Sequence, residues 1–176
     1  MVTNPKQIRF IIEKAIFLAN QSPKGPVWID IPLDIQNSYL DTKTLKGFKK
    51  KINKPKCNSK DLNFVANQLE KSNRPTVLIG SGVKSAAAKK DLKEFIKKYQ
   101  IPLVYSTAAP DVYGSKNKLS IGSVGSQGCS RAGNFAMQNS DLLLVLGSRL
   151  NSNIIGEDPS KFARNSKIII IDINKK

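Results

Sequence analysis

The sequence predicts an α/β protein with a doubly wound parallel sheet. Four short apolar runs, at 76–79, 103–105, 142–146 and 167–171, each have the length of a buried strand. Amphipathic segments with helical spacing lie between them, and glycine-rich or polar loops follow them. Strands that are apolar throughout and alternate with amphipathic helices are typical of a parallel sheet covered on both faces.

The N-terminal part of the sequence predicts one helix followed by one strand. Asn4 and Pro5 supply a helix cap and a favoured first-turn proline. The segment PVWIDIP at 26–32 is alternating, rich in β-branched residues and bounded by prolines, which predicts a strand. The apolar residues that recur at helical spacing after the cap are Ile8, Ile11, Ile12, Ala15 and Ile16.

A lysine-rich segment then separates this helix and strand from the rest of the chain. Residues 37–57 show little periodicity and include three consecutive lysines at 49–51, which is typical of a solvated linker. We therefore expect three parts: a helix and strand at 1–36, a linker at 37–57 and the doubly wound domain at 58–176.

The helices of the larger domain follow from apolar periodicity. A helix is expected after Cys129, between the apolar runs at 103–105 and 142–146. Two earlier helices are marked by Leu62, Val65, Ala66 and Leu69, and by Ala88, Leu92, Phe95, Ile96 and Tyr99.

Composition narrows the classes of function. The formal charge is +16, but only five of the 29 basic residues are arginines and no aromatic residues are interleaved with them. This favours a solvated surface over specific nucleic-acid binding. No apolar run approaches the roughly 18 residues of a membrane span and no signal-peptide pattern is present, so we expect a cytoplasmic protein. The chain has no histidine and two distant cysteines, which excludes histidine-based catalysis and the usual zinc patterns.

Glycine-rich and polar loops follow the predicted strands. In a parallel sheet such loops meet at the carboxyl edge, where doubly wound folds bind their ligands. Their shared position is a stronger signal than any one of them. The loops are Gly80–Gly82, Ser106–Thr107, Gly122–Ser130, Gly147–Asn153 and Asp172–Asn174.

These loops match no complete nucleotide-binding motif. The motif G-x-G-x-x-G would need a third glycine where Ser85 stands and a carboxylate at the tip of the next strand, near Ser106. The Walker motif fails because Asn134 and Phe135 stand where lysine and serine or threonine are needed. Two interpretations of Gly80–Gly82 stay open, a ligand-binding loop and a tight corner between strand and helix.

Three features at this edge offer another way to hold a nucleotide. Gly125 and Gly128 precede a helix whose backbone N–H groups and dipole would favour an anion. Asp172 has the chemistry to accept hydrogen bonds from ribose hydroxyls, and Arg149 to bind a phosphate or stack on a ring. The alternative is structural, with Asp172 as a helix cap and Arg149 in a surface ion pair.

Taken in order, the motifs resemble the acetolactate synthase-like group of thiamine diphosphate-dependent enzymes. The resemblance covers nearly the whole chain. It implies that residues 1–36 are the end of a pyrimidine-binding domain and that 58–176 form a Rossmann-like central domain, incomplete at its C-terminus. The segments that carry it are KGPVWIDIPLDIQ, RPTVLIGSGVKSA, IPLVYSTAAPDVYG, SVGSQGCSRAGNFAMQNSDLLLVLGSRL and KIIIIDIN.

The resemblance implies a partial chain of a larger enzyme. Members of this group bind thiamine diphosphate and Mg²⁺ between a first and a third domain of a homodimer or homotetramer, and act on small 2-oxo acids. The group's activating glutamate and its Gly-Asp-Gly segment have no counterpart here. We therefore expect no catalytic and no metal-binding residue, and a chain that is inactive alone. Neither a specific nucleic acid nor a membrane is expected as a partner.

The central domain of several relatives binds FAD or an ADP-containing molecule, which implies a set of cofactor-binding residues. Two departures weigh against FAD: Gln127 stands where flavin-binding relatives tend to have histidine, and Asn151–Asn153 replaces an Asp-Asp-Arg series. An empty or ADP-type pocket stays open beside FAD, and a free-standing nucleotide-binding module without catalysis is the alternative function. The implied residues are Gly80, Ser81, Gly82, Thr107, Gly125, Gly128, Gly147, Ser148, Arg149, Asp172 and Ile173.

Overall fold

The computed structural model describes residues 1–21, 24–49 and 57–173. The chain divides into two compact units, Met1–Lys56 and Cys57–Lys176, and each is described by itself.

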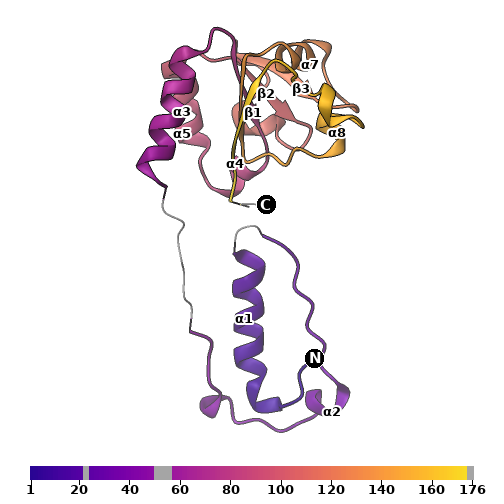
Figure 1. The fold of residues 1–176 in the computed structure, drawn as a ribbon. Helices are drawn as coiled ribbons and strands as arrows, with labels where there is room; N and C mark the ends of the chain where they lie inside the picture. The colour runs from indigo at the N-terminus through magenta and orange to yellow at the C-terminus, as the bar shows by residue number, and fades with distance from the viewer. Residues whose placement is uncertain (22–23, 50–56, 174–176) are drawn as a thin grey trace. The chain divides into compact units, whose positions relative to one another are not determined.

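The N-terminal unit is built around one long helix, α1 (Ile8–Asn20), shown in Figure 1. A 3-10 turn, η1 (Pro5–Gln7), leads into it, and Asn4 Oδ1 accepts a hydrogen bond from Lys6 N–H at 3.0 Å. The predicted helix is therefore confirmed, and Asn4 caps the 3-10 turn that leads into it. A short helix, α2 (Leu33–Gln36), and a second 3-10 turn, η2 (Thr42–Thr44), follow along the chain.

The prediction of a strand at residues 26–32 is wrong. This segment is extended but belongs to no sheet. Among the described residues, its one backbone hydrogen bond to a distant extended segment is the bond that Val2 N–H donates to Asp30 O at 2.8 Å. A strand needs a neighbour along its length to accept and donate backbone hydrogen bonds, and the described part of this unit offers none.

Part of the segment predicted as a linker packs against α1. Phe48 N–H donates to Glu13 Oε2 at 2.7 Å, and the Phe48 ring lies 5.5 Å from the Phe10 ring and 5.3 Å from the Phe17 ring. Glu13 also accepts a hydrogen bond from Arg9 Nε at 2.8 Å. These contacts hold Phe48, in the segment predicted as a linker, against α1.

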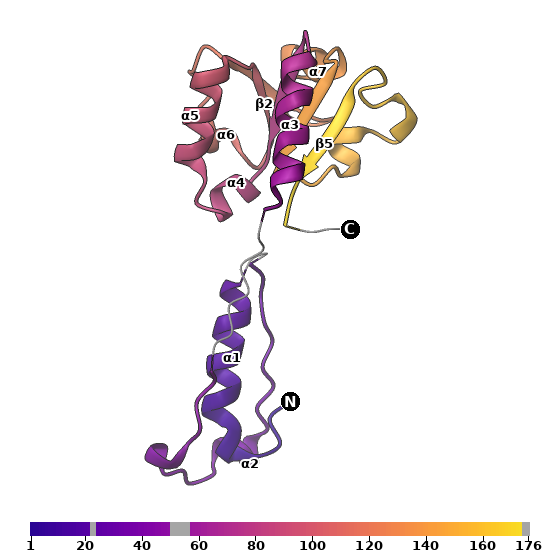
Figure 2. The same cartoon turned by 60° about the vertical axis from the view of Figure 1, so that its left-hand side comes forward.

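The larger unit is an open sheet of five parallel strands in the order β3-β2-β1-β4-β5. This is the doubly wound arrangement, so the predicted fold class is confirmed. Figure 1 shows α3 and α5 on one side of the sheet and α7 on the other, and in Figure 2 the helix α3 lies in front of the strands. The strands are β1 (Pro75–Ile79), β2 (Leu103–Ser106), β3 (Ser120–Val124), β4 (Leu142–Leu146) and β5 (Lys167–Ile171). The helices are α3 (Ser59–Lys71), α4 (Gly82–Ser85), α5 (Lys89–Tyr99), α6 (Pro110–Tyr113), α7 (Arg131–Gln138) and α8 (Ser152–Ile155), with a 3-10 turn, η3 (Pro159–Lys161).

Successive residues of the central strands enter two separate cores. Val77 and Ile79 of β1 pack in the core beneath α3 and α5, whereas Leu78 between them packs in the core beneath α7 and α8. In β4, Leu144 belongs to the first core and Leu143 to the second. Side chains alternate across a strand, so a strand that is apolar throughout must be covered on both faces.

The two edge strands differ from the prediction. Ser120–Val124 is a strand, β3, although its serines and Gly122 led the sequence to predict a loop from Gly122 onward. It pairs with β2 in parallel, for example Ser106 with Val124. The strand β5 is apolar as predicted, but it is only partly covered: Ile169 packs against the core beneath α3 and α5, whereas Ile168 and Ile170 are 37% and 55% exposed.

Candidate functional site at the carboxyl edge of the sheet

The strand order reverses between β1 and β4. The chain runs outward from β1 to β2 and β3 on one side, and from β4 to β5 on the other. At such a point the loops that leave the two central strands turn away in opposite directions, which is where doubly wound folds form a ligand crevice. The loop 80–82 follows β1 and the loop 147–149 follows β4.

These two loops touch backbone to backbone. Gly82 N–H donates to Gly147 O at 2.9 Å, and a Cβ atom added at Gly80 would stand 2.3 Å from that same oxygen. A Cβ added at Gly82 would stand 2.6 Å from it. Only residues without a side chain allow this approach. The tight corner is thus a packing requirement of the fold, whatever ligand the loop holds.

The hydrogen bonds of this corner use most of its backbone donors. Gly80 N–H donates to Leu146 O at 3.0 Å, and Gly147 N–H donates to Ile171 O at 2.9 Å. With Gly82 N–H also engaged, the three glycines hold β1, β4 and β5 together at their carboxyl ends. A ligand at this edge would therefore depend on side chains more than on these N–H groups.

The loop after β3 is organised by Asn134 of α7. Its side-chain amide donates to Gly125 O at 2.9 Å, while its Oδ1 accepts from Gly125 N–H at 3.0 Å. Ser126 N–H donates to Asn153 O at 2.7 Å, which joins this loop to the one after β4. Asn134 stands where a Walker motif would have lysine, and here it has a structural role.

The helix predicted after Cys129 is confirmed: it is α7, which begins at Arg131. Ser130 is the N-cap, and its Oγ accepts a hydrogen bond from Gly133 N–H at 2.8 Å. One of the N–H groups expected to face an anion is therefore satisfied within the chain. Gly128 itself is exposed and has a positive φ of 62°.

The remaining predicted residues lie at the same edge but differ in exposure. Arg149 is exposed, and its guanidinium has no hydrogen-bond or ion-pair partner among the residues that the structure describes. Asp172 and Ile173 are exposed beyond the end of β5, whereas Ser148 is buried. Thr107 follows β2, and no hydrogen bond within the described ranges joins it to the other predicted residues.

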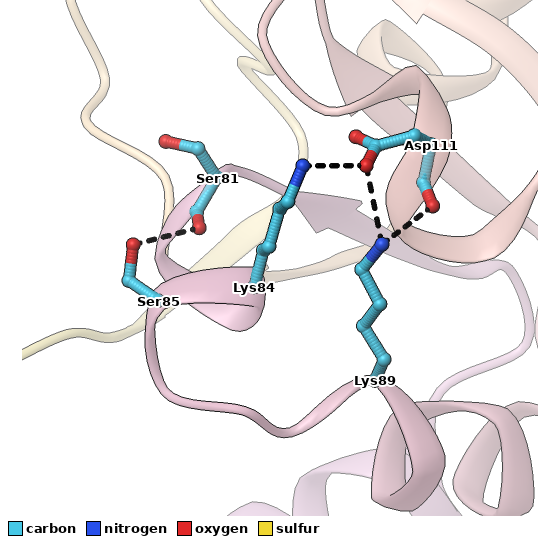
Figure 3. Close-up of polar contacts among 5 residues, drawn as sticks. All are labelled: Ser81, Lys84, Ser85, Lys89 and Asp111. Atoms are coloured by element: carbon cyan, nitrogen blue, oxygen red, sulfur yellow. Dashed lines mark hydrogen bonds and ion pairs between the residues drawn. The ribbon is translucent and has the colours of Figure 1, made fainter.

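A charged cluster at this edge was missed by the sequence analysis. Lys84 Nζ lies 2.8 Å and Lys89 Nζ 3.1 Å from Asp111 Oδ2 (Figure 3). Hydrogen bonds from Lys84 and Lys89 lower the pKa of Asp111 to about 2. The cluster joins α4 and α5 to α6. No local pattern could have found it, because its members are 22 and 27 residues apart.

Two features that the described residues lack bear on the class of site. No group of three or more histidine, cysteine, aspartate or glutamate side chains in them is placed to hold a metal ion. Likewise, none of the helices seen in residues 1–21, 24–49 and 57–173 has the length and apolar character that crossing a bilayer requires.

Comparison with protein families matches residues 62–176 to the family described as "Thiamine pyrophosphate enzyme, central domain". This match covers more than half of the chain. The chain belongs to the thiamine pyrophosphate enzyme family. The resemblance found in the sequence motifs is thereby confirmed, and the doubly wound unit corresponds to the central domain of these enzymes.

Curated relatives of this thiamine pyrophosphate enzyme chain include acetolactate synthases. It is 30% identical over 175 residues to the acetolactate synthase isozyme 1 large subunit of Escherichia coli, covering 99% of this chain and 30% of the relative. It is 32% identical over 179 residues to the acetolactate synthase large subunit of Corynebacterium glutamicum, covering 99% of this chain and 28% of the relative. It is 30% identical over 179 residues to the chloroplastic acetolactate synthase of Arabidopsis thaliana, covering 99% of this chain and 26% of the relative. The chain thus spans less than a third of the length of these relatives.

Proposed function

We propose that the chain works within a thiamine diphosphate-dependent 2-oxo acid carboligase or decarboxylase resembling acetolactate synthase. In this proposal residues 58–176 are a central domain that binds ADP or FAD without performing the main chemistry, and residues 1–36 belong to the pyrimidine-binding domain. The enzyme would act on a small 2-oxo acid as a cytoplasmic homodimer or homotetramer, without a nucleic acid or membrane partner. The relatives named acetolactate synthase support the enzyme class.

The residues of this chain do not fit thiamine diphosphate or its Mg²⁺ ion. No Gly-Asp-Gly sequence occurs in it. Glu13, a carboxylate of the N-terminal unit, accepts hydrogen bonds from Arg9 and Phe48 instead of facing a cofactor. We therefore derive no step of thiamine chemistry from these residues, and this chain's share of the function is the carboxyl edge of its sheet.

The observation that supports a nucleotide at this edge is the contact of the two glycine loops at the reversal of strand order. Arg149 directly follows this contact in the chain and is exposed, and the carboxyl edge of a doubly wound sheet is where such folds bind ligands. Arg149 would bind a phosphate as a charged fork, and Asp172 would accept hydrogen bonds from the ribose hydroxyls. Because the glycine N–H groups are engaged within the fold, these two side chains would supply most of the binding free energy.

Calorimetric titration of ADP and of FAD into the chain tests the proposal. Asp172→Ala and Arg149→Ala should each weaken binding about tenfold, the loss expected for one charge-assisted hydrogen bond of about 1.5 kcal/mol at an exposed site. Lys50→Ala, in the segment predicted as a linker, is the control for non-specific attraction and should change nothing at moderate salt. Equal losses in all three variants, or no binding by the parent chain, would refute the nucleotide site.

One observation favours the alternative, a free-standing nucleotide-binding module. The unit Cys57–Lys176 is compact and has cores on both sides of its sheet. The alternative predicts that residues 57–176 alone are monodisperse and bind ADP as tightly as the whole chain. Aggregation of the isolated unit would count against it.

A further inference from the structure

Two lysines converge on one carboxylate oxygen at the edge of the sheet where the proposed nucleotide would lie. Lys84 Nζ is 2.8 Å from Asp111 Oδ2, and Lys89 Nζ is 3.1 Å from the same atom. Figure 3 shows the two ammonium groups approaching Asp111 from α4 and α5. The cluster holds two positive charges and one negative charge, so its net charge is positive and attracts an anion.

The two lysines are bound unequally. Lys89 makes a second hydrogen bond, to the main-chain oxygen of Asp111 at 2.9 Å, and its side chain is 37% exposed. Lys84 has the single bond to Oδ2 and is 60% exposed. If Lys84 turned away, Asp111 would keep Lys89 as its counter-ion. If Lys89 turned away, two hydrogen bonds would be lost. Lys84 is therefore the ammonium group that can change partner at the smaller cost.

The position of Lys84 suits a phosphoryl group. It lies in α4, which begins at Gly82, directly in the loop after β1. Asp111 lies in α6, four residues after Thr107 in the segment that follows β2. The pair thus spans neighbouring strand ends at the ligand-binding edge. A lysine ammonium is a compact point charge on a flexible stem that binds phosphates without a fixed geometry.

We propose that Lys84 is a movable phosphate-binding residue, held by Asp111 when no ligand is present and transferred to a phosphoryl group of the ligand, while Lys89 remains with Asp111. The inference rests on the proposed nucleotide site for its location. It makes Asp111 a competitor of the ligand. Removing the charge of Asp111 then strengthens binding, and removing the charge of Lys84 weakens it.

A purely structural role of the cluster would give a different result. If the cluster only fixed α4 and α5 against α6, Asp111→Asn and Lys84→Gln would both loosen that edge and both weaken binding. If Asp111→Asn strengthens binding and Lys84→Gln weakens it, Lys84 is a movable phosphate-binding residue and the role of the cluster is not purely structural.

The test is calorimetric titration of ADP and of inorganic pyrophosphate into the whole chain at one fixed ionic strength. Lys84→Gln should weaken binding of both probes roughly tenfold, while Asp111→Asn should tighten it about threefold. Lys97→Gln is the matched control, because Lys97 is an exposed lysine in the last turn of α5, at the opposite end of this helix from Lys89. It should change affinity less than twofold, or about 0.4 kcal/mol.

The outcomes separate this inference from the proposed function. If Arg149→Ala weakens ADP binding but neither Lys84→Gln nor Asp111→Asn changes it, the nucleotide site stands and the movable residue is refuted. If ADP does not bind but pyrophosphate binds and follows the predicted signs, the movable residue stands without the nucleotide site. Weaker binding by Asp111→Asn, equal losses in Lys97→Gln, or no binding of either probe would overturn the inference. Far-UV circular dichroism confirms that each variant keeps its fold.

Discussion

The two units of the chain use their apolar residues differently. In the described part of the sheet unit, side chains such as Leu78 and Leu143 are fully buried between strands and helices. In the described part of the N-terminal unit, only Val2 and Ala15 are buried apolar residues, whereas Trp28 is 92% exposed. Both units formed the helices that the sequence predicted, but only the larger one formed its predicted strands.

This contrast shows which elements the local sequence determines. A helix satisfies its backbone groups within its own segment, so the spacing of Ile8, Ile11 and Ala15 with the Asn4 cap was sufficient for α1. A strand depends on a neighbour. The segment 26–32 and the strand β1 were both predicted as strands, yet only β1 has strands beside it, β2 and β4.

The largest expected effect comes from truncating a side chain in the core. Leu143→Ala should lower the free energy of unfolding of the sheet unit by about 2 to 5 kcal/mol, because it removes buried surface and leaves a cavity. Trp28→Ala, at an exposed side chain of the N-terminal unit, should change the free energy of unfolding of its own unit by about 0.5 kcal/mol or less. Denaturant unfolding followed by far-UV circular dichroism checks both. Equal losses would contradict the contrast between the units.

A smaller effect is expected at the glycine corner. Gly80→Ala should cost about 1 to 3 kcal/mol of stability, because the added Cβ would stand 2.3 Å from Gly147 O. Gly25→Ala is the matched control in the other unit: no atom lies within 4 Å of its added Cβ, and it should be neutral or slightly stabilising. The same unfolding measurement applies. A neutral Gly80→Ala would show that the loops can separate without cost.

A pH effect is expected from Asp141, which precedes β4. Its carboxylate accepts hydrogen bonds from the Ser72 hydroxyl, Asn73 N–H at 2.7 Å and Arg74 N–H at 3.0 Å. Burial alone would raise the pKa of Asp141, but the hydrogen bonds from Ser72, Asn73 and Arg74 outweigh it and lower the pKa from 3.8.

Because the folded pKa is lowered, the stability that Asp141 contributes is present above its unfolded pKa and is lost as the pH falls through the folded pKa. Asp141→Asn should therefore destabilise the sheet unit by about 1 kcal/mol at pH 7 and reduce its loss of stability on acidification below about pH 4. Asp30→Asn, at an exposed carboxylate of the other unit, is the control. Unfolding curves at pH 7 and pH 3 check this. An unchanged acid dependence would exclude the role of Asp141.

Much of the fold could be predicted from local patterns, and the exceptions share a cause. Continuous apolar runs gave β1, β2, β4 and β5, but β3 was missed because Ser120, Gly122 and Ser123 show neither an apolar run nor clear alternation. The residues of the candidate site were found through their place after strands. The contact of Gly82 with Gly147 and the roles of Asn134 and the Lys84–Asp111 pair were not, because each depends on a segment distant in sequence.

Hydrogen exchange with and without ADP tests most directly the claim that the sheet unit carries both the stable core and the nucleotide site. Without ADP, amides around Leu78 and Leu144 should exchange slowest and those of 26–32 fast, because the buried strands are paired with neighbours on both sides and the segment 26–32 belongs to no sheet. With ADP, exchange should slow further in the segments after β1 and β4, around Ser81 and Arg149, and should not change in residues 1–49. Equal protection of both units, or an unchanged pattern when ADP is added at saturating concentration, would contradict the account.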